Sequence, residues 1–156
     1  MPNIIGHCWQ PNRPSEILRT LEIKYESESK NMSMSLAQKL AADSVAAVAE
    51  GRNLQDVLAE IRAAHPQLTA QENGALQDIA YGCQRYLGSL KHMLGQMLKK
   101  PIDNPQLESL LLAAMYQLHY TRNAPHAVVN EAVESIAKIG RGQFRSFANA
   151  ILRRFL

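Results

Sequence analysis

Residues 104–118 read NPQLESLLLAAMYQL, and this stretch decides the fold class of the chain. Asn104 followed by Pro105 is typical of a helix start, because Asn caps the first turn and Pro needs no amide hydrogen there. Six apolar residues then recur at spacings of three and four, which places them on one face of a helix. They are Leu107, Leu110, Leu111, Ala114, Met115 and Leu118.

The helical pattern extends from this stretch toward the N-terminus. One helix is predicted near residues 36–50, with Gly51 as its C-terminal stop. The next is predicted to begin after Asn53 as its N-cap and to end at His65-Pro66, since the residue before a proline disfavours helical backbone.

A longer helix is predicted between residue 69 and Pro101. Thr69 and Glu72 have the spacing of a capping box, which marks its start. Gly82 or Gly88 is expected to bend or split it, because glycine weakens a helix interior.

Two more helices are predicted after residue 124. Ala124-Pro125 begins the first of them, Gly140 to Gly142 predict a loop, and apolar residues at helical spacing continue to Phe155. No segment alternates with period two in a way that competes with these helices. The predicted fold class is therefore all-α, a compact bundle of about six helices that are stable only when packed together.

Residues 1–34 differ from the rest and are predicted to form an irregular leader. Three prolines lie among the first 14 residues, Ser15 is a candidate cap for a short helix, and residues 26–31 are polar and typical of a linker. Two interpretations stay open for the leader. It is either a poorly ordered arm or a stretch upstream of the natural start, since Met32 and Met34 directly precede the regular pattern.

Composition excludes several classes of protein. A chain of 156 residues can form one domain with one core, and no run of 18 or more apolar residues predicts a membrane span. The first residues do not have the pattern of a secretory signal. The two cysteines form no Cys-x-x-Cys pair, which fits a reducing compartment. These features predict a cytoplasmic protein with no membrane partner.

The motifs of common enzymes are also missing. The eight glycines are scattered, so no phosphate-binding loop is predicted, and the five histidines have no metal-ligand spacing. Glu131 and Glu134 are expected to be solvated residues of a helix, and Cys83 is expected to be a small core residue. We therefore predict no catalytic residue, no metal ligand and no cofactor in this chain.

Positive charge is segregated, although the net charge is only +3. Residues 138–156 hold five basic and no acidic residues, and residues 85–100 hold four basic and no acidic ones. Such segregation suits a polyanion partner, and a solvated surface with uneven charge is the alternative interpretation. Tyr116 and Tyr120 either line a surface for unpaired bases or pack at the edge of the core. The candidate RNA-binding residues are Arg85, Arg122, His126, Lys138, Arg141 and Arg145.

Three segments together resemble a known domain. Residues 115–122 read MYQLHYTR, residues 125–134 read PHAVVNEAVE, and residues 147–155 read FANAILRRF. These motifs resemble the NusB-like domain at the N-terminus of the Sun/Fmu/RsmB family, which methylates a cytosine of small-subunit ribosomal RNA at carbon five. The resemblance covers residues 35–156. It implies an all-α, RNA-binding accessory domain with ribosomal RNA as its partner.

The same resemblance implies what this chain lacks. In the family, methyl transfer belongs to a separate Rossmann-like domain that bears a Pro-Cys motif and binds S-adenosylmethionine. The chain contains no Pro-Cys dipeptide, so no catalytic role passes to any of its residues.

Two alternative functions remain open. The first is the free-standing antitermination factor NusB, which binds a leader RNA together with a ribosomal protein. Its N-terminus typically carries an arginine cluster, whereas the matching residues 33–40 here hold a single cation, Lys39. The second is a protein-docking module that binds a methyltransferase catalytic domain or a ribosomal protein.

Overall fold

The structure, a computed structural model, describes residues 14–156. The chain divides into two compact units, residues 1–30 and residues 31–156. In the first unit the described residues, 14–30, are helical. Across residues 14–156 there are seven α-helices, one 3₁₀ turn and no strand, which confirms the predicted all-α class.

The element order is simple, with short connections between successive helices. The elements are α1 (Pro14–Ala49), α2 (Leu54–Ala64), α3 (Ala70–Arg85), α4 (Leu87–Met97), α5 (Pro105–Tyr120), α6 (Pro125–Ala137), the 3₁₀ turn η1 (Gly140–Gly142) and α7 (Arg145–Phe155).

Helix α1 corrects the prediction for the leader. The polar segment 26–31 is helical and not a linker, so the short helix expected from Ser15 and the helix expected near 36–50 are one element. The physical reason is that Glu, Ser, Lys and Asn tolerate helical backbone, and no proline or glycine lies between Ser15 and Gly51. The part of the prediction that concerns residues 1–13 lies outside the described residues.

The long helix predicted before Pro101 is two helices, so the bundle has one more helix than the pattern indicated. The split falls at Tyr86, with φ −107° and ψ 16°, and not at Gly82 or Gly88. Its amide still donates to the carbonyl oxygen of Gly82 at 3.0 Å, so the backbone bends without losing that hydrogen bond.

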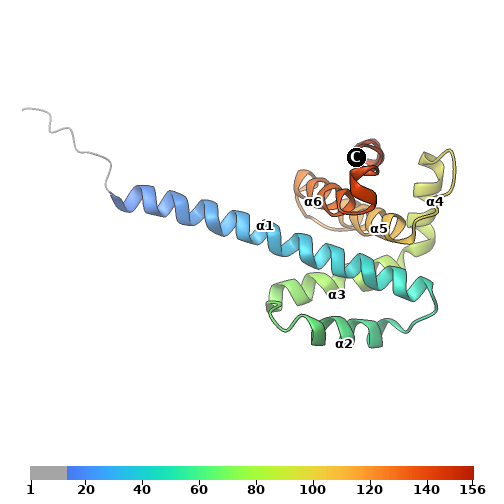
Figure 1. The fold of residues 1–156 in the computed structure, drawn as a ribbon, viewed down its shortest axis with the longest axis horizontal. Coiled ribbons are helices and arrows are strands. Elements are labelled where there is room, and N and C mark those ends of the chain that lie inside the picture. Colours follow the sequence, from blue (N-terminus) through green and yellow to red (C-terminus); the bar gives the residue numbers. More distant parts are fainter. Residues whose placement is uncertain (1–13) are drawn as a thin grey trace, which may run out of the picture. The chain divides into compact units, whose positions relative to one another are not determined.

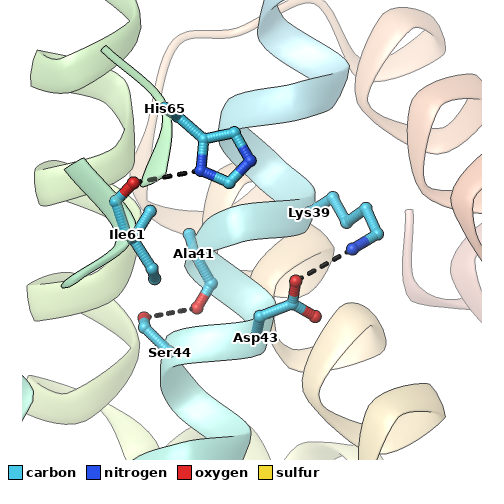
Figure 2. A network of polar contacts seen from close by, with 6 residues as sticks. All are labelled: Lys39, Ala41, Asp43, Ser44, Ile61 and His65. Atoms are coloured by element: carbon cyan, nitrogen blue, oxygen red, sulfur yellow. Dashed lines mark hydrogen bonds and ion pairs between the residues drawn. The ribbon is translucent and has the colours of Figure 1, made fainter. Parts of the chain in front are cut away.

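The predicted caps are present. The side chain of Asn53 accepts hydrogen bonds from the amides at the start of α2, and Asn104 does the same for α5. Thr69 and Glu72 form the full capping box of α3. Gly51 follows α1 with φ +96°, a conformation that favours glycine. The other end of α2 is closed by the ring of His65, whose Nδ1 lies 3.0 Å from the carbonyl oxygen of Ile61 (Figure 2).

Helix α5 lies at the centre of the second unit. It packs against α3 and α4 on one side of its length and against α6 and α7 on the other (Figure 1). Its residues 109–117 are buried without interruption. The core is therefore built around one helix that is buried on all sides, and the other helices each bury only one face.

A buried pair of amides ties three helices together inside this core. Gln38 of α1 donates through Nε2 to Oε1 of Gln117 in α5 at 2.6 Å, and also to the carbonyl oxygen of Val128 in α6 at 3.4 Å. Both glutamine side chains are almost completely buried. A buried amide is costly unless it is hydrogen-bonded, so this pair favours one register of α1 against α5.

Gly82 sets the distance between α3 and α5. A Cβ atom at this position would lie 2.0 Å from Cζ of Tyr116. The Tyr116 ring cannot easily give way, because it is buried and its hydroxyl donates to Oδ1 of Asp78 at 3.2 Å. Burial, and then the nearby Asp78 carboxylate, raise the pKa of Tyr116 to about 12.

We therefore expect Gly82→Ala to destabilise the fold by about 1–3 kcal/mol, the usual cost of overpacking. The matched control is Gly74→Ala on the same helix, where an added Cβ meets nothing within 4 Å. Gly74→Ala is expected to stabilise the chain by about 0.5–1 kcal/mol through helix propensity. Urea denaturation of both variants measures this, and equal effects would show that the close approach at Gly82 does not constrain the packing.

Candidate functional site

Helix ends carry the six residues predicted to bind RNA, and all six side chains are exposed. Most of them surround α6 and α7. In chain order they are Arg85 at the end of α3, Arg122 before α6, His126 in the first turn of α6, Lys138 directly after α6, Arg141 in η1 and Arg145 at the start of α7.

A groove between α6 and α7 brings two of the six together. We call it the basic groove; it has a volume of about 810 Å³. His126 lines it from α6 and Arg145 from α7, together with the polar side chains of Asn130 and Asn149. Arg85, Arg122, Lys138 and Arg141 are not among its lining residues. The predicted set is therefore divided over the surface and does not form one site.

Arg153 also lines the basic groove, although it was not among the six predicted RNA-binding residues. Its Nε donates to Oδ1 of Asn149 at 3.0 Å. Arg145, Asn149 and Arg153 follow each other at intervals of four residues, which places them on one face of α7. That spacing was visible in the sequence and could have identified Arg153.

The guanidinium of Arg145 forms an ion pair with the carboxylate of Glu134. The two side chains are 56% and 48% exposed, so water reaches the pair. Exposed ion pairs are weak, typically about 0–1 kcal/mol. A phosphate can compete for Arg145, but the carboxylate lowers the net positive charge of the groove.

Arg141 has an unusual backbone for its residue type. Its φ of +57° and ψ of 36° are left-handed, and Gly140 and Gly142 on either side also have positive φ. A side chain in this region costs about 1–2 kcal/mol relative to ordinary backbone. The chain therefore holds an exposed cation at a position where glycine would be less strained.

Arg85 lies in a second groove, apart from the other predicted residues. We call it the tyrosine groove; its volume is about 560 Å³. Four tyrosines and the side chains of Asp78 and Arg85 line it. The tyrosines are Tyr81, Tyr86, Tyr116 and Tyr120. Of the tyrosine pair named above, Tyr116 is buried at the core edge, whereas Tyr120 is exposed.

Cys83 is buried, as expected for a small core residue. Burial, and then the Asp78 carboxylate, raise the pKa of its thiol to about 12, so it stays protonated and unreactive at neutral pH. Cys8 lies outside the described residues. Among residues 14–156 no group of three or more His, Cys, Asp or Glu side chains is placed to hold a metal ion.

Lys39, the single cation of the segment 33–40, is already paired. Its Nζ lies 2.9 Å from Oδ2 of Asp43, one turn further along α1 (Figure 2). The carboxylate of Asp43 therefore offsets the charge of Lys39.

A comparison with known families agrees with this architecture. The model of the NusB family matches residues 35–156, which is more than three quarters of the chain. The chain belongs to the NusB family. The relatives that it matches in sequence are longer proteins, and the match covers only part of each.

Two of these relatives are named ribosomal RNA small subunit methyltransferase B. The protein of Sodalis glossinidius is 35% identical over 119 residues, which cover 74% of this chain and 27% of that protein. The protein of Cronobacter sakazakii is 31% identical over 121 residues, which cover 76% of this chain and 28% of that protein. The chain therefore spans just over a quarter of the length of these relatives.

Glu131 of the NusB domain was expected to be solvated, and that prediction is wrong. The residue lies on the same face of α6 as Val128 and Ser135 and is only 9% exposed. It has no hydrogen-bond or ion-pair partner among the described residues. Burial raises the pKa of its carboxyl from 4.5 to about 7.

The shift predicts a pH dependence of stability. The folded state holds this proton more tightly than the unfolded state. Glu131 therefore does not lower the free energy of unfolding below about pH 4.5, and it lowers it increasingly as the pH rises toward 7. Glu131→Gln should therefore be more stable than the wild type near pH 8, by on the order of 3 kcal/mol, with a smaller difference near pH 5.

Denaturation at the two pH values measures the effect. Glu134→Gln on the same helix is the matched control, because this exposed carboxylate should change stability little at either pH. If Glu131→Gln showed the same small difference at both pH values, the carboxyl would not be desolvated as described.

Proposed function

We propose that this NusB domain is an RNA-binding accessory domain of a small-subunit ribosomal RNA cytosine-C5 methyltransferase. The observation that carries the proposal is the basic groove on a domain whose relatives are named as methyltransferases of that RNA. Residues 138–156 supply five cations and no carboxylate, and α7 directs two of its arginines and one asparagine to the groove. Arginine forks and amides suit phosphate oxygens and the edges of bases.

The chain itself is proposed to carry no methyl transfer. That step, and the S-adenosylmethionine that it needs, would belong to a catalytic domain outside this chain, which spans just over a quarter of the relatives. The work of the domain would lie in binding and orienting the RNA. A cytoplasmic location fits such a substrate, and no described helix is long and apolar enough to cross a membrane.

The antitermination alternative has less support. NusB typically carries an arginine cluster near its N-terminus, whereas the matching residues 33–40 hold one cation, Lys39, which is paired with Asp43. We keep protein docking as the second candidate, because an apolar groove of about 750 Å³ lies between the connection from α4 to α5 and the start of α7. Leu98, Ile102 and Phe144 line it, and Phe147 is 37% exposed there. Light scattering with a separately expressed methyltransferase domain would detect such a complex.

RNA binding is expected to be weak and strongly dependent on salt. If three cations contact phosphates, the affinity for labelled fragments of small-subunit ribosomal RNA should fall about 40-fold when the salt concentration rises about fourfold. Arg141→Gly should lower this affinity and reduce the salt slope by about one, without loss of stability, because glycine suits the left-handed backbone.

Arg52→Gln is the matched control for that experiment. It also removes one exposed cation, but in the connection between α1 and α2, where Arg52 pairs with Glu60. Absence of binding by the wild type at both low and high salt would overturn the proposed function. An equal loss for Arg52→Gln and Arg141→Gly would show that only net charge matters.

The ion pair of Arg145 predicts a gain of affinity. Glu134→Gln removes the carboxylate beside the basic groove and leaves the Arg145 guanidinium available to phosphate. We expect about a two- to fivefold increase in RNA affinity at low salt, which disappears at high salt because of screening. Arg145→Gln in the same background should abolish the gain. A decrease for Glu134→Gln alone would mean that the ion pair holds Arg145 in its binding position.

A further inference from the structure

Four tyrosines gather in the tyrosine groove, and three of their rings form a nearly parallel set. The rings of Tyr86 and Tyr120 are stacked with centroids 4.0 Å apart and planes 10° apart. Tyr116 and Tyr120 are stacked at 5.6 Å and 25°. The ring of His119 meets Tyr120 edge-on at 4.6 Å. Tyr120 is thus held in one orientation by Tyr86, which lies between α3 and α4, and by Tyr116 and His119 on α5 before any ligand arrives.

Two of the tyrosines are exposed although they are large. Tyr81 is 41% exposed and Tyr120 is 36% exposed. The buried Tyr116 has an evident packing role against Gly82, whereas Tyr81 and Tyr120 are exposed and line the groove. Aromatic faces at the surface of a groove are surfaces on which planar ligands stack.

The composition of the groove indicates which kind of ligand it suits. The nine residues that line it include no Leu, Ile, Val, Met or Phe, and only Gly, Gln, Asp, Tyr and Arg occur. The apolar groove, by contrast, contains Met, Leu, Ile and Phe side chains that suit a protein helix or loop, alongside Lys99, Lys100, Asp103 and Asn104. Tyrosine rings with polar groups around them suit a base, which has a flat face and hydrogen-bonding edges.

The tyrosine groove has a negative and a positive side chain at different positions along α3. Asp78, Tyr81 and Arg85 occupy one face of this helix at intervals of three and four residues. Asp78 and Arg85 are therefore about 10 Å apart along the helix axis, since each residue rises about 1.5 Å. Asp78 already accepts the hydrogen bond of the Tyr116 hydroxyl, and Arg85 is exposed at the other end. This arrangement suits a nucleotide whose base lies near Asp78 and whose negatively charged phosphate lies near Arg85.

We propose that the tyrosine groove binds one unpaired base of a single RNA strand, stacked against Tyr81 and Tyr120, with the adjoining phosphate held by Arg85. This inference rests on the proposed function, because it assigns a second RNA contact to the same domain. It adds a preference for single-stranded RNA that the basic groove does not provide. Phosphate contacts alone bind duplex and single strand by charge, whereas stacking needs an unpaired base.

The test uses a short oligouridine that carries one central 2-aminopurine, whose fluorescence is quenched when the base stacks. The full chain should quench this signal, and Tyr81→Leu and Tyr120→Leu should abolish the quenching and lower the affinity about tenfold. The same strand closed into a duplex should be bound equally by wild type and variants. Arg85→Gln should lower the affinity and reduce the salt slope by about one.

Tyr81→Phe and Tyr120→Phe are the matched controls, because they keep the ring faces and should keep the quenching. Thermal denaturation of each variant verifies folding, and Tyr81 is the cleaner position because its ring is not stacked on another aromatic ring among residues 14–156. Normal single-strand affinity and quenching in folded Tyr81→Leu would overturn the inference and leave the proposed function intact. No RNA binding by the wild type would overturn both, and loss of affinity for a methyltransferase domain in Tyr81→Leu would assign the groove to protein docking.

Discussion

The structure depends on the complete burial of one helix. Residues 109–117 of α5 are buried in succession, so the helix needs partners on every side of its axis. Helices α3, α4, α6 and α7 provide them, and α1 reaches the same core through Gln38. A helix that is apolar all round is stable only inside such a bundle, and this requirement orders the second unit.

The same burial positions the surfaces that could bind RNA. Because α6 and α7 both pack on α5, their outer edges meet along the basic groove. Because α3 approaches α5 closely at Gly82, the side chain of Tyr116 packs against Gly82, and its ring is stacked with that of Tyr120. Both grooves are therefore consequences of the core, and neither requires a long or irregular loop.

Charge and strain distinguish the two grooves from ordinary surface. Beside the basic groove the carboxylate of Glu134 forms an ion pair with Arg145, and η1 holds Arg141 in a backbone that favours glycine. The tyrosine groove combines exposed rings with one cation and one carboxylate, at opposite ends of one helix face. A domain that contacts RNA through both grooves would bind phosphates at the basic groove and unpaired bases at the tyrosine groove.

The sequence by itself determined the helices, their caps and the family, because these depend on local rules. The capping residues bind amides within a few residues of themselves, so their role can be predicted without a structure. They are Asn53, Thr69 with Glu72, and Asn104. Local rules failed at residues 26–31, where polar residues without a proline or glycine continue a helix. They also failed at Tyr86, where the helix breaks instead of at the nearby Gly82 or Gly88. The predicted cations lie at the surface, but the sequence did not show which of them share a groove.

Only the tertiary structure decided which side chains meet. Gln38 and Gln117 are 79 residues apart in the chain, Tyr116 and Asp78 are 38 apart, and Arg145 and Glu134 come from different helices. The burial of Glu131 likewise depends on the helices that cover its face of α6 and not on its own neighbours in sequence. Such pairs follow from the angles and registers at which helices pack, and these are set by the volume of the whole core, which no local pattern encodes.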